Sequence, residues 1–277
     1  MRELGTPKQN TWCPGCGNFG ILNAFKHSIE QLVAEGIGLD EIVITCGIGC
    51  HGKIFDYLNL SGIYALHGRA LATAQGIKLA DPALIVISFG GDGDSLGEGL
   101  EHTLFAAKRN MDVTLILHNN GNYGLTTGQF SPLSAVGYKG LSTPRGNIER
   151  PFEPIPLLLE AGATFVARAY SAKPEHLRDM ITAAVKHKGF SFVEVLQPCV
   201  SYNNTYNYYN QKVKLLEAIP SRKVQSVELA RATEEVYLGI FYQNDQPVFH
   251  EQLYQDANPA RSRLTSEQRK VIYGEKR

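Results

Sequence analysis

The sequence shows neither a signal peptide nor an apolar stretch long enough to cross a membrane. We therefore expect no membrane association and a location in the reducing cytoplasm, where disulfide bonds are rare. Net charge is also absent, because 27 Lys and Arg residues balance 27 Asp and Glu residues. No basic block stands out, so nucleic acid is not an expected partner. The sequence also lacks internal repeats and low-complexity tracts, which argues against a repeat protein.

The length and composition of the chain fit one α/β domain with an extension. The chain has 277 residues, of which 43% are apolar, and this is enough to build a complete core. We expect the domain over residues 1–200 and the extension over residues 201–277. Tyrosines among asparagines, followed by mixed-charge segments, give the extension little apolar periodicity. We therefore predict that it is irregular and packs on a partner subunit.

Apolar periodicity indicates alternating strands and helices along the first 200 residues. Helices are expected at residues 17–34, 67–79, 95–109 (with Ser95 as N-cap), 155–161 and 174–188. Strands are expected at residues 41–45, 84–89, 113–118, 164–169 and 190–196. This alternation is typical of the α/β class, a parallel sheet with helices on both faces. Residues 128–156 are rich in Gly, Pro and Ser and have no clear period, which is typical of a functional loop.

Two polar motifs follow two of these expected strands. The GDGD motif of residues 91–94 follows residues 84–89, and an Asn pair ending in Asn120 closes the strand at residues 113–118. In a parallel sheet both motifs lie outside the carboxyl ends of the strands, so Asp92 and Asn120 face one crevice. A carboxylate, an amide oxygen and a diphosphate are suitable ligands for Mg²⁺. The spacing resembles the thiamine-diphosphate signature, although Asp92 could instead cap the following helix.

Five cysteines are present, at positions 13, 16, 46, 50 and 199. Cys46 ends an apolar strand, where a small buried thiol is an ordinary core residue. The other four, Cys13, Cys16, Cys50 and Cys199, could hold zinc or a [4Fe–4S] cluster, and their spacing alone does not decide. The chemistry favours the cluster, because thiamine diphosphate makes an electron-rich intermediate from a 2-oxo acid, and a nearby cluster can oxidise it.

Taken together, these motifs resemble the β subunit of a 2-oxoacid:ferredoxin oxidoreductase. The matching segments follow the order of that family and run from Trp12 to Cys199. They are WCPGCG at residues 12–17, GIGC at 47–50, LHGRA at 66–70, GDGD at 91–94, NGNYGLT at 120–126 and LQPC at 196–199. The YGLTTGQ segment at residues 123–129, followed by Ser131 and Pro132, is closer to the 2-oxoglutarate and broad 2-oxoacid enzymes than to dedicated pyruvate enzymes.

The resemblance implies three cofactors and the residues that hold them. The [4Fe–4S] cluster would be held by Cys13, Cys16, Cys50 and Cys199. Mg²⁺ would be held by Asp92, Asn120 and the peptide oxygen of Asn122. Thiamine diphosphate would contact Ile48, Gly49, Cys50, His51, His67, Gly93, Asp94, Gly124 and Leu125. In this interpretation, Asp94 acts chiefly through its neighbouring backbone.

Further roles follow from the same match. Lys53 would bring a cation near the substrate carboxylate, although a solvated lysine fits equally well. Leu125 would lie beside the thiazolium ring and the substrate tail. His67 would hydrogen-bond a cofactor phosphate, although an ordinary packed histidine is the alternative. Thr127 departs from family members that carry lysine there, which leaves recognition of a distal carboxylate open.

The implied reaction is CoA-dependent oxidative decarboxylation of 2-oxoglutarate, or in reverse the reductive carboxylation of succinyl-CoA, with ferredoxin as the electron partner. The alternatives are a pyruvate-specific β subunit, a non-oxidative 2-oxo acid decarboxylase, and a non-catalytic zinc or iron–sulfur electron-transfer module. Family thiamine enzymes activate the cofactor with a glutamate on a separate pyrimidine-binding domain, for which this chain has no room. We therefore expect activity only with an α subunit, or an α plus γ pair, in a dimer of heterodimers.

Overall fold

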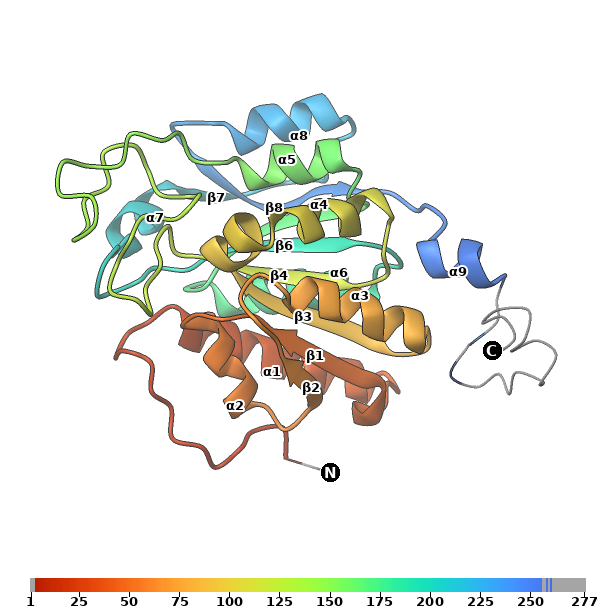
Figure 1. The fold of residues 1–277 in the computed structure, drawn as a ribbon. Helices are drawn as coiled ribbons and strands as arrows, with labels where there is room; N and C mark the ends of the chain where they lie inside the picture. The colour runs from red at the N-terminus through yellow and green to blue at the C-terminus, as the bar shows by residue number, and fades with distance from the viewer. Residues whose placement is uncertain (1–2, 256–257, 259, 261–277) are drawn as a thin grey trace, which may run out of the picture.

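A computed structural model describes residues 3–255, 258 and 260, and an eight-stranded sheet runs through its centre (Figure 1). The strands are β1 (Ile42–Cys46), β2 (Ser61–Tyr64), β3 (Ile85–Gly91), β4 (Thr114–Asn119), β5 (Phe165–Tyr170), β6 (Ser191–Leu196), β7 (Val213–Leu215) and β8 (Val236–Gln243). Their order is β2-β1-β3-β4-β6-β5-β8-β7, and β8 runs antiparallel to β5 while the other pairs of described strands are parallel. The predicted α/β class is confirmed.

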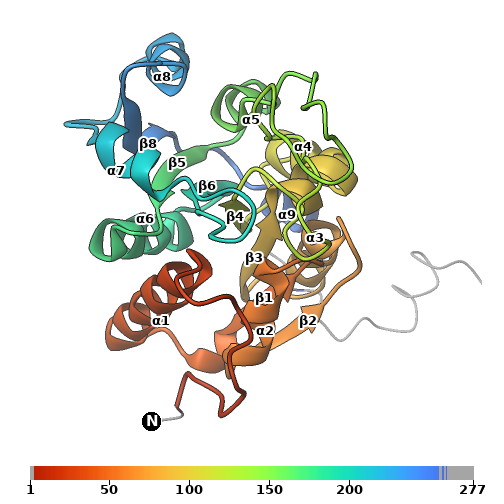
Figure 2. The same ribbon diagram turned by 90° about the vertical axis from the view of Figure 1, so that its left-hand side faces the viewer.

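Helices cover both faces of this sheet (Figure 2). They are α1 (Asn18–Ala34), α2 (Ile54–Tyr57), α3 (Ala70–Ala80), α4 (Leu100–Lys108), α5 (Pro154–Ala161), α6 (Pro174–Lys186), α7 (Tyr206–Lys212), α8 (Lys223–Ala230) and α9 (Phe249–Tyr254), with short turns at Leu39–Glu41, His51–Lys53 and Asp94–Glu98. Helices α1 and α6 pack on one face, and α3, α4 and α5 pack on the other. In the part of the chain that the structure describes, no helix has the length and apolar character needed to cross a membrane.

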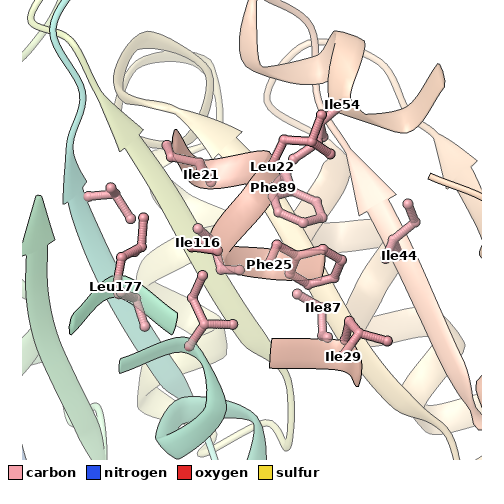
Figure 3. Packing of buried hydrophobic residues seen from close by; sticks show 14 of the residues in the cluster. Ile21, Leu22, Phe25, Ile29, Ile44, Ile54, Ile87, Phe89, Ile116 and Leu177 are labelled. Atoms are coloured by element: carbon pink, nitrogen blue, oxygen red, sulfur yellow. The ribbon is translucent and has the colours of Figure 1, made fainter. Parts of the chain in front are cut away.

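The central strands are apolar throughout because both of their faces are covered. On β4, Leu115 and Leu117 join the core beneath α3, α4 and α5, whereas Ile116 between them joins the core beneath α1 and α6. Successive side chains of a strand point to opposite sides, so a continuous apolar run suits a sheet buried on both faces. Figure 3 shows the α1 side, where the rings of Phe25 and Phe89 meet edge to face with centroids 4.9 Å apart.

The register of β1, β3 and β4 brings their carboxyl ends to one edge of the sheet. Cys46 is level with Phe89, and Gly91 is level with His118. From β1 the chain continues to β2 on one side, whereas from β3 it continues to β4 on the other side. The gap between β1 and β3 is therefore the topological switch point, where parallel α/β sheets bind their ligands.

Some elements in the first half of the chain differ from the expectations, among them helix α2 (Ile54–Tyr57), which was not predicted. The helix predicted from Ser95 begins with a π-helical turn, Asp94–Glu98, and Ser95 is buried inside that turn instead of capping it. Regular α-helix starts only at Leu100, after a glycine. Strand β2 was not predicted, because its four residues include a glycine and are all exposed, which leaves no alternating pattern.

The C-terminal segment is more regular than its sequence suggested. Strand β8 joins the main sheet beside β5, with Leu238 and Phe241 buried, so Val236–Gln243 is a strand of the domain. Helix α8 packs against α5, as Figure 1 also shows. The extension thus completes the sheet that the first 200 residues begin. Its packing on a partner subunit remains a prediction, and residues 256–257, 259 and 261–277 lie outside the described part.

Candidate active site

A pocket opens at the switch point, between the loops that follow β1, β2, β3 and β4. It is lined by Ile48, Gly49, Cys50, His51, His67, Gly91, Asp92, Gly93, Asp94, Asn120, Asn122, Tyr123, Gly124, Leu125 and Thr126. The fold therefore brings together every residue that the motifs assigned to thiamine diphosphate and to Mg²⁺. Gly91, Tyr123 and Thr126 line the pocket in addition.

The carboxylate of Asp94 holds three of these loops together. Its Oδ1 accepts hydrogen bonds from the backbone N–H groups of Ile48 (3.0 Å) and Gly68 (2.8 Å). His67 Nδ1 lies 2.9 Å from the same oxygen, and His51 Nε2 lies 3.5 Å from Oδ2. Burial alone would raise the pKa of Asp94, but the two imidazoles and the Gly68 N–H together lower it well below its usual value. The side chain of Asp94 therefore organises the pocket, and the action of its neighbouring backbone at the diphosphate remains a prediction.

Two glycines make room for this carboxylate. A Cβ added at Gly47 would lie 1.9 Å from Asp94 Oδ2. Gly68, whose N–H donates to Asp94, has a φ of +69°, a conformation that residues with a Cβ rarely adopt. The glycines after β1 and β2 thus allow the loops to close around Asp94.

His67 stands at the rim of the pocket with 36% of its side chain exposed. The hydrogen bond with Asp94 raises its pKa, and the nearby charge of Glu98 acts in the same direction against the effect of burial. An imidazole that holds its proton more firmly suits an anionic ligand. The partly exposed ring on the pocket wall is compatible with the predicted phosphate contact, which remains a prediction.

Asp92 lines the same pocket and is almost completely buried, with 1% of its surface exposed. Ser131, in the long loop after β4, donates a hydrogen bond from its hydroxyl to Asp92 Oδ2. Burial raises the pKa of Asp92 to about 6 in spite of that bond. An ionised carboxylate at this position therefore costs free energy unless a cation lies beside it.

Sequence reasoning missed the two serines that fasten the long loop to the site. Besides the Ser131 bond to Asp92, Ser134 Oγ accepts a hydrogen bond from the Ser131 N–H (2.7 Å) and donates one to the carbonyl oxygen of Gly121 (2.6 Å). Both serines are buried. The available signal is the Ser-Pro pair at residues 131–132, which the family resemblance connects only with the class of substrate.

The asparagine turn after β4 supplies amide oxygens. Asn120 Oδ1 accepts a hydrogen bond from the Asn122 N–H (3.2 Å), and Asn122 Nδ2 donates to the Asn120 carbonyl oxygen (3.0 Å). Asn122 Oδ1 is buried and has no hydrogen-bond partner among the described residues. Buried polar atoms are rarely left unpaired, so this oxygen marks a place where a bound group would supply the partner.

A second cavity, lined by sulfur, adjoins the first. Cys13, Cys16, Cys50 and Cys199 all line it, and Cys50, Asn120 and Gly124 line both cavities. Burial raises the pKa of Cys16 to about 11, and the neighbouring thiols add to the rise. Cys46 lines neither cavity and is fully buried on β1. Within the described residues, no three His, Cys, Asp or Glu side chains form a ready-made metal site.

The two residues predicted to act on the substrate lie in different places. Leu125 lines the first pocket and is 47% exposed. Lys53 lines the cysteine cavity instead, with Nζ 3.5 Å from the carbonyl oxygen of Thr11. Its charge lowers the pKa of Cys50, although burial has the larger, opposite effect. The predicted role of Lys53 toward a substrate carboxylate therefore has no support from its position. Thr127, the other residue considered for substrate recognition, lines neither of the two cavities.

A parallel sheet with an acid motif and an amide motif at its switch point defines the diphosphate-binding domain of a thiamine-diphosphate enzyme. Two family models match the chain in agreement with this class. The model for the thiamine pyrophosphate enzyme, C-terminal TPP binding domain, matches residues 47–195. The model for the C-terminal part of the pyruvate ferredoxin oxidoreductase beta subunit matches residues 199–257.

Similar proteins narrow the class to one family. The chain is 44% identical to the 2-oxoacid:ferredoxin oxidoreductase subunit beta of Saccharolobus solfataricus, over 91% of this chain and 87% of the relative. It is 36% identical to the 2-oxoglutarate synthase subunit KorB of Methanothermobacter thermautotrophicus, over 87% of this chain and 85% of the relative. A solved 2-oxoglutarate:ferredoxin oxidoreductase from Magnetococcus marinus matches with a TM-score of 0.90 and 33% identity, over 99% of this chain and 95% of that chain. The chain belongs to the 2-oxoacid:ferredoxin oxidoreductase β subunits.

Ionisation of Asp92 should oppose folding of the cofactor-free protein. Its folded pKa is raised to about 6, so its unfavourable contribution is absent at low pH and grows as the pH rises from about 4. We expect Asp92→Asn to unfold at a higher temperature than the wild type at pH 8, and the gain to vanish at pH 4. Thermal unfolding monitored by circular dichroism measures this, with the exposed Asp179→Asn as control. A wild type as stable as the Asp92 variant at pH 8 would contradict the argument.

Asp94→Asn should lower the pKa of His67, because the Asp94 hydrogen bond is the main cause of its upward shift. We therefore expect the His67 imidazole to titrate at lower pH in the variant, as followed by NMR. Glu98→Gln is the matched control, since the Glu98 carboxylate lies farther from His67 Nδ1, at 3.5 Å, and is 44% exposed. An equal or larger shift in the Glu98 variant would show that Asp94 does not control this group.

Proposed function

We propose that this chain is the catalytic β subunit of a CoA-dependent 2-oxoglutarate:ferredoxin oxidoreductase. The reaction is oxidative decarboxylation of 2-oxoglutarate to succinyl-CoA, and it can run in reverse as reductive carboxylation. The observation that carries the proposal is the common wall of the two cavities, to which Cys50, Asn120 and Gly124 belong. An organic cofactor in the first cavity and a cluster in the second would be close enough to exchange electrons.

Thiamine diphosphate and Mg²⁺ suit the first cavity. Asp92, Asn120 and the peptide oxygen of Asn122 would supply hard oxygen ligands, which Mg²⁺ prefers. The raised pKa of Asp92 and the unpaired Oδ1 of Asn122 both support a cation-bearing ligand here. His67 and the backbone beside Gly93 would meet the diphosphate. Bound thiamine diphosphate supplies the electron sink that allows a 2-oxo acid to lose CO₂.

A [4Fe–4S] cluster suits the second cavity better than zinc does. Zn²⁺ has no redox chemistry, whereas the proposed oxidative decarboxylation needs an electron acceptor beside the thiamine cofactor. Two polar side chains donate to the sulfurs, since Ser201 Oγ lies 3.2 Å from Cys13 Sγ and Gln197 Nε2 lies 3.6 Å from Cys16 Sγ. Such hydrogen bonds set the reduction potential of iron–sulfur clusters. Such a cluster would supply the electron acceptor that the oxidative decarboxylation needs, and ferredoxin would take up the electrons.

2-Oxoglutarate is proposed as the substrate for two reasons. Relatives such as the Methanothermobacter subunit carry 2-oxoglutarate in their names, and the similar solved structure holds 2-oxoglutarate, coenzyme A and succinyl-CoA. The YGLTTGQ segment favours the same substrate, and its Leu125 and Thr126 line the pocket. Pyruvate is the alternative, because other relatives are named only as 2-oxoacid enzymes and the C-terminal family model is named for pyruvate.

A partner subunit is proposed because the pocket lacks a group that activates the pyrimidine ring. No glutamate lines it among the described residues, and Oδ1 of Asp94 is occupied by its own hydrogen bonds, while the buried Oδ2 lies 3.5 Å from His51 Nε2. Large apolar side chains also remain exposed near its entrance or on its long loop, namely Leu66 (77%), Leu141 (86%) and Ile148 (90%). Exposed apolar groups of this kind are typical of a protein interface. An α subunit, or an α plus γ pair, would cover them and supply the missing acid.

Cys50→Ser should abolish the cluster, whereas Cys46→Ser should leave it intact. Cys50 lines the sulfur cavity with Cys13, Cys16 and Cys199, but Cys46 is fully buried on β1 and lines neither cavity. Iron and acid-labile sulfide per chain, determined after anaerobic purification, measure the outcome. Full iron content in Cys50→Ser, or its loss in Cys46→Ser, would refute the assignment.

The isolated chain should not turn over any 2-oxo acid. Adding the α partner should restore CoA-dependent ferredoxin reduction, with 2-oxoglutarate used faster than pyruvate. Asp92→Ala, assembled with the same partner, is the negative control, because it removes the proposed carboxylate ligand of Mg²⁺. Robust turnover by the isolated chain would refute the need for a partner, whereas a pyruvate preference of the complex would overturn only the choice of substrate.

A further inference from the structure

The side chain of Gln197 contacts both proposed cofactor sites. It lies just after β6 and is 1% exposed. Its Oε1 accepts a hydrogen bond from Asn120 Nδ2 (3.0 Å). Its Nε2 donates to the carbonyl oxygen of Pro198 (2.8 Å) and points toward Cys16 Sγ (3.6 Å). One buried amide thus spans the distance between the oxygen-lined and the sulfur-lined cavity.

These contacts fix the orientation of the side-chain amides of Gln197 and Asn120. A side-chain amide carries donors on one side and an acceptor on the other. Because Gln197 Oε1 receives the Asn120 donor, Oδ1 of Asn120 must face the other way, where it accepts the Asn122 N–H. A chain of contacts therefore runs from Cys16 through Gln197 to Asn120. This chain turns the side-chain oxygen of Asn120 toward the asparagine turn.

The backbone holds Gln197 in this position. Its N–H extends the sheet by donating to the carbonyl oxygen of Asn119 (2.8 Å). On the other side, Gly17 leaves the space that the side chain fills. A Cβ at Gly17 would lie 2.8 Å from Ser171 Oγ, and 2.9 Å from Cγ and 3.2 Å from Nε2 of Gln197. The glycine next to Cys16 therefore allows the amide to reach the thiol.

We infer that Gln197 is a positioning residue for both cofactors. It holds Asn120 with its oxygen available to Mg²⁺, and it donates a hydrogen bond toward the cluster ligand Cys16. A donor near a cluster thiolate stabilises the extra negative charge of the reduced state and so raises the reduction potential. The inference rests on the proposed function, because it takes Asn120 as a metal ligand and Cys16 as a cluster ligand.

Three variants of the assembled enzyme separate the two contacts. Gln197→Leu removes both. Gln197→Glu, measured at pH 8, keeps an acceptor for Asn120 but removes the donor toward Cys16 and toward the Pro198 carbonyl oxygen. Gly17→Ala leaves Gln197 chemically unchanged but displaces it. The matched controls are Gln225→Glu, on the exposed side of α8, and Gly76→Ala, whose added Cβ would meet nothing within 4 Å.

The readouts are the calorimetric affinity for thiamine diphosphate with Mg²⁺, the cluster reduction potential from an EPR-monitored titration, and the iron content. We expect Gln197→Leu to weaken cofactor binding about 10–100-fold, as for other residues that orient metal ligands, and to lower the potential. Gln197→Glu should lower the potential but bind the cofactor nearly as well as the wild type. Gly17→Ala should weaken binding, and both controls should behave as the wild type.

Several results would overturn the inference. One is a Gln197→Leu enzyme with full iron content, wild-type affinity and an unchanged potential, because Gln197 would then only fill space. Another is equal loss of affinity in the Leu and Glu variants, which would show that the acceptor does not matter. If Gln197→Leu does not assemble, the comparison is made between Gln197→Glu and Gly17→Ala. Equal affinities of these two variants for thiamine diphosphate would again show that the acceptor for Asn120 does not matter. A wild-type enzyme without iron or without cofactor binding would instead refute the proposed function itself.

Discussion

The buried carboxylate of Asp94 is the interaction on which the pocket depends. Parallel strands end at one edge of a sheet, but the loops that follow them leave in different directions and need a common anchor. Asp94 comes from the loop after β3 and accepts N–H groups from the loops after β1 and β2, at Ile48 and Gly68. Its charge is tolerated because His51 and His67 lie against it. The pocket is therefore organised by contacts within the chain itself.

The two cavities differ in the chemistry of their donors, although they share a wall. Oxygen donors such as Asp92 and Asn122 line only one cavity, and most of the cysteine sulfurs line only the other. Oxygen ligands suit Mg²⁺, whereas thiolates suit iron–sulfur clusters and zinc, so the proposed sites would differ in the metals that they favour. Cys50 is the one cysteine that lines both. Separation by ligand type would thus allow the two proposed metal centres to lie close together without exchange of their metals.

The sequence predicted those features that depend on neighbouring residues or on strand ends. The apolar run of β4 and the motifs around Asp92 and Asn120 could be located, because strand ends in a parallel sheet must converge. The contact of Ser131 with Asp92 could not be predicted, because its loop has no periodic pattern and contains several serines that could equally make such a contact. The contact of Gln197 with Asn120 could not be predicted either, because it depends on β6 lying next to β4. The order of the strands along the chain would instead place β5 next to β4.

The C-terminal strands show a further limit and also a consequence for assembly. Gly239, with its positive φ, interrupts the apolar run of β8, so the sequence there indicates no regular strand. In the folded chain β8 covers the edge of β5, and the sheet ends in β7 with three residues on one side and in β2 with four on the other. Long unpaired edge strands invite other chains to add a strand, and these short ones offer few free backbone groups. We therefore expect other subunits to attach chiefly through side chains and loops, and not by extending the sheet.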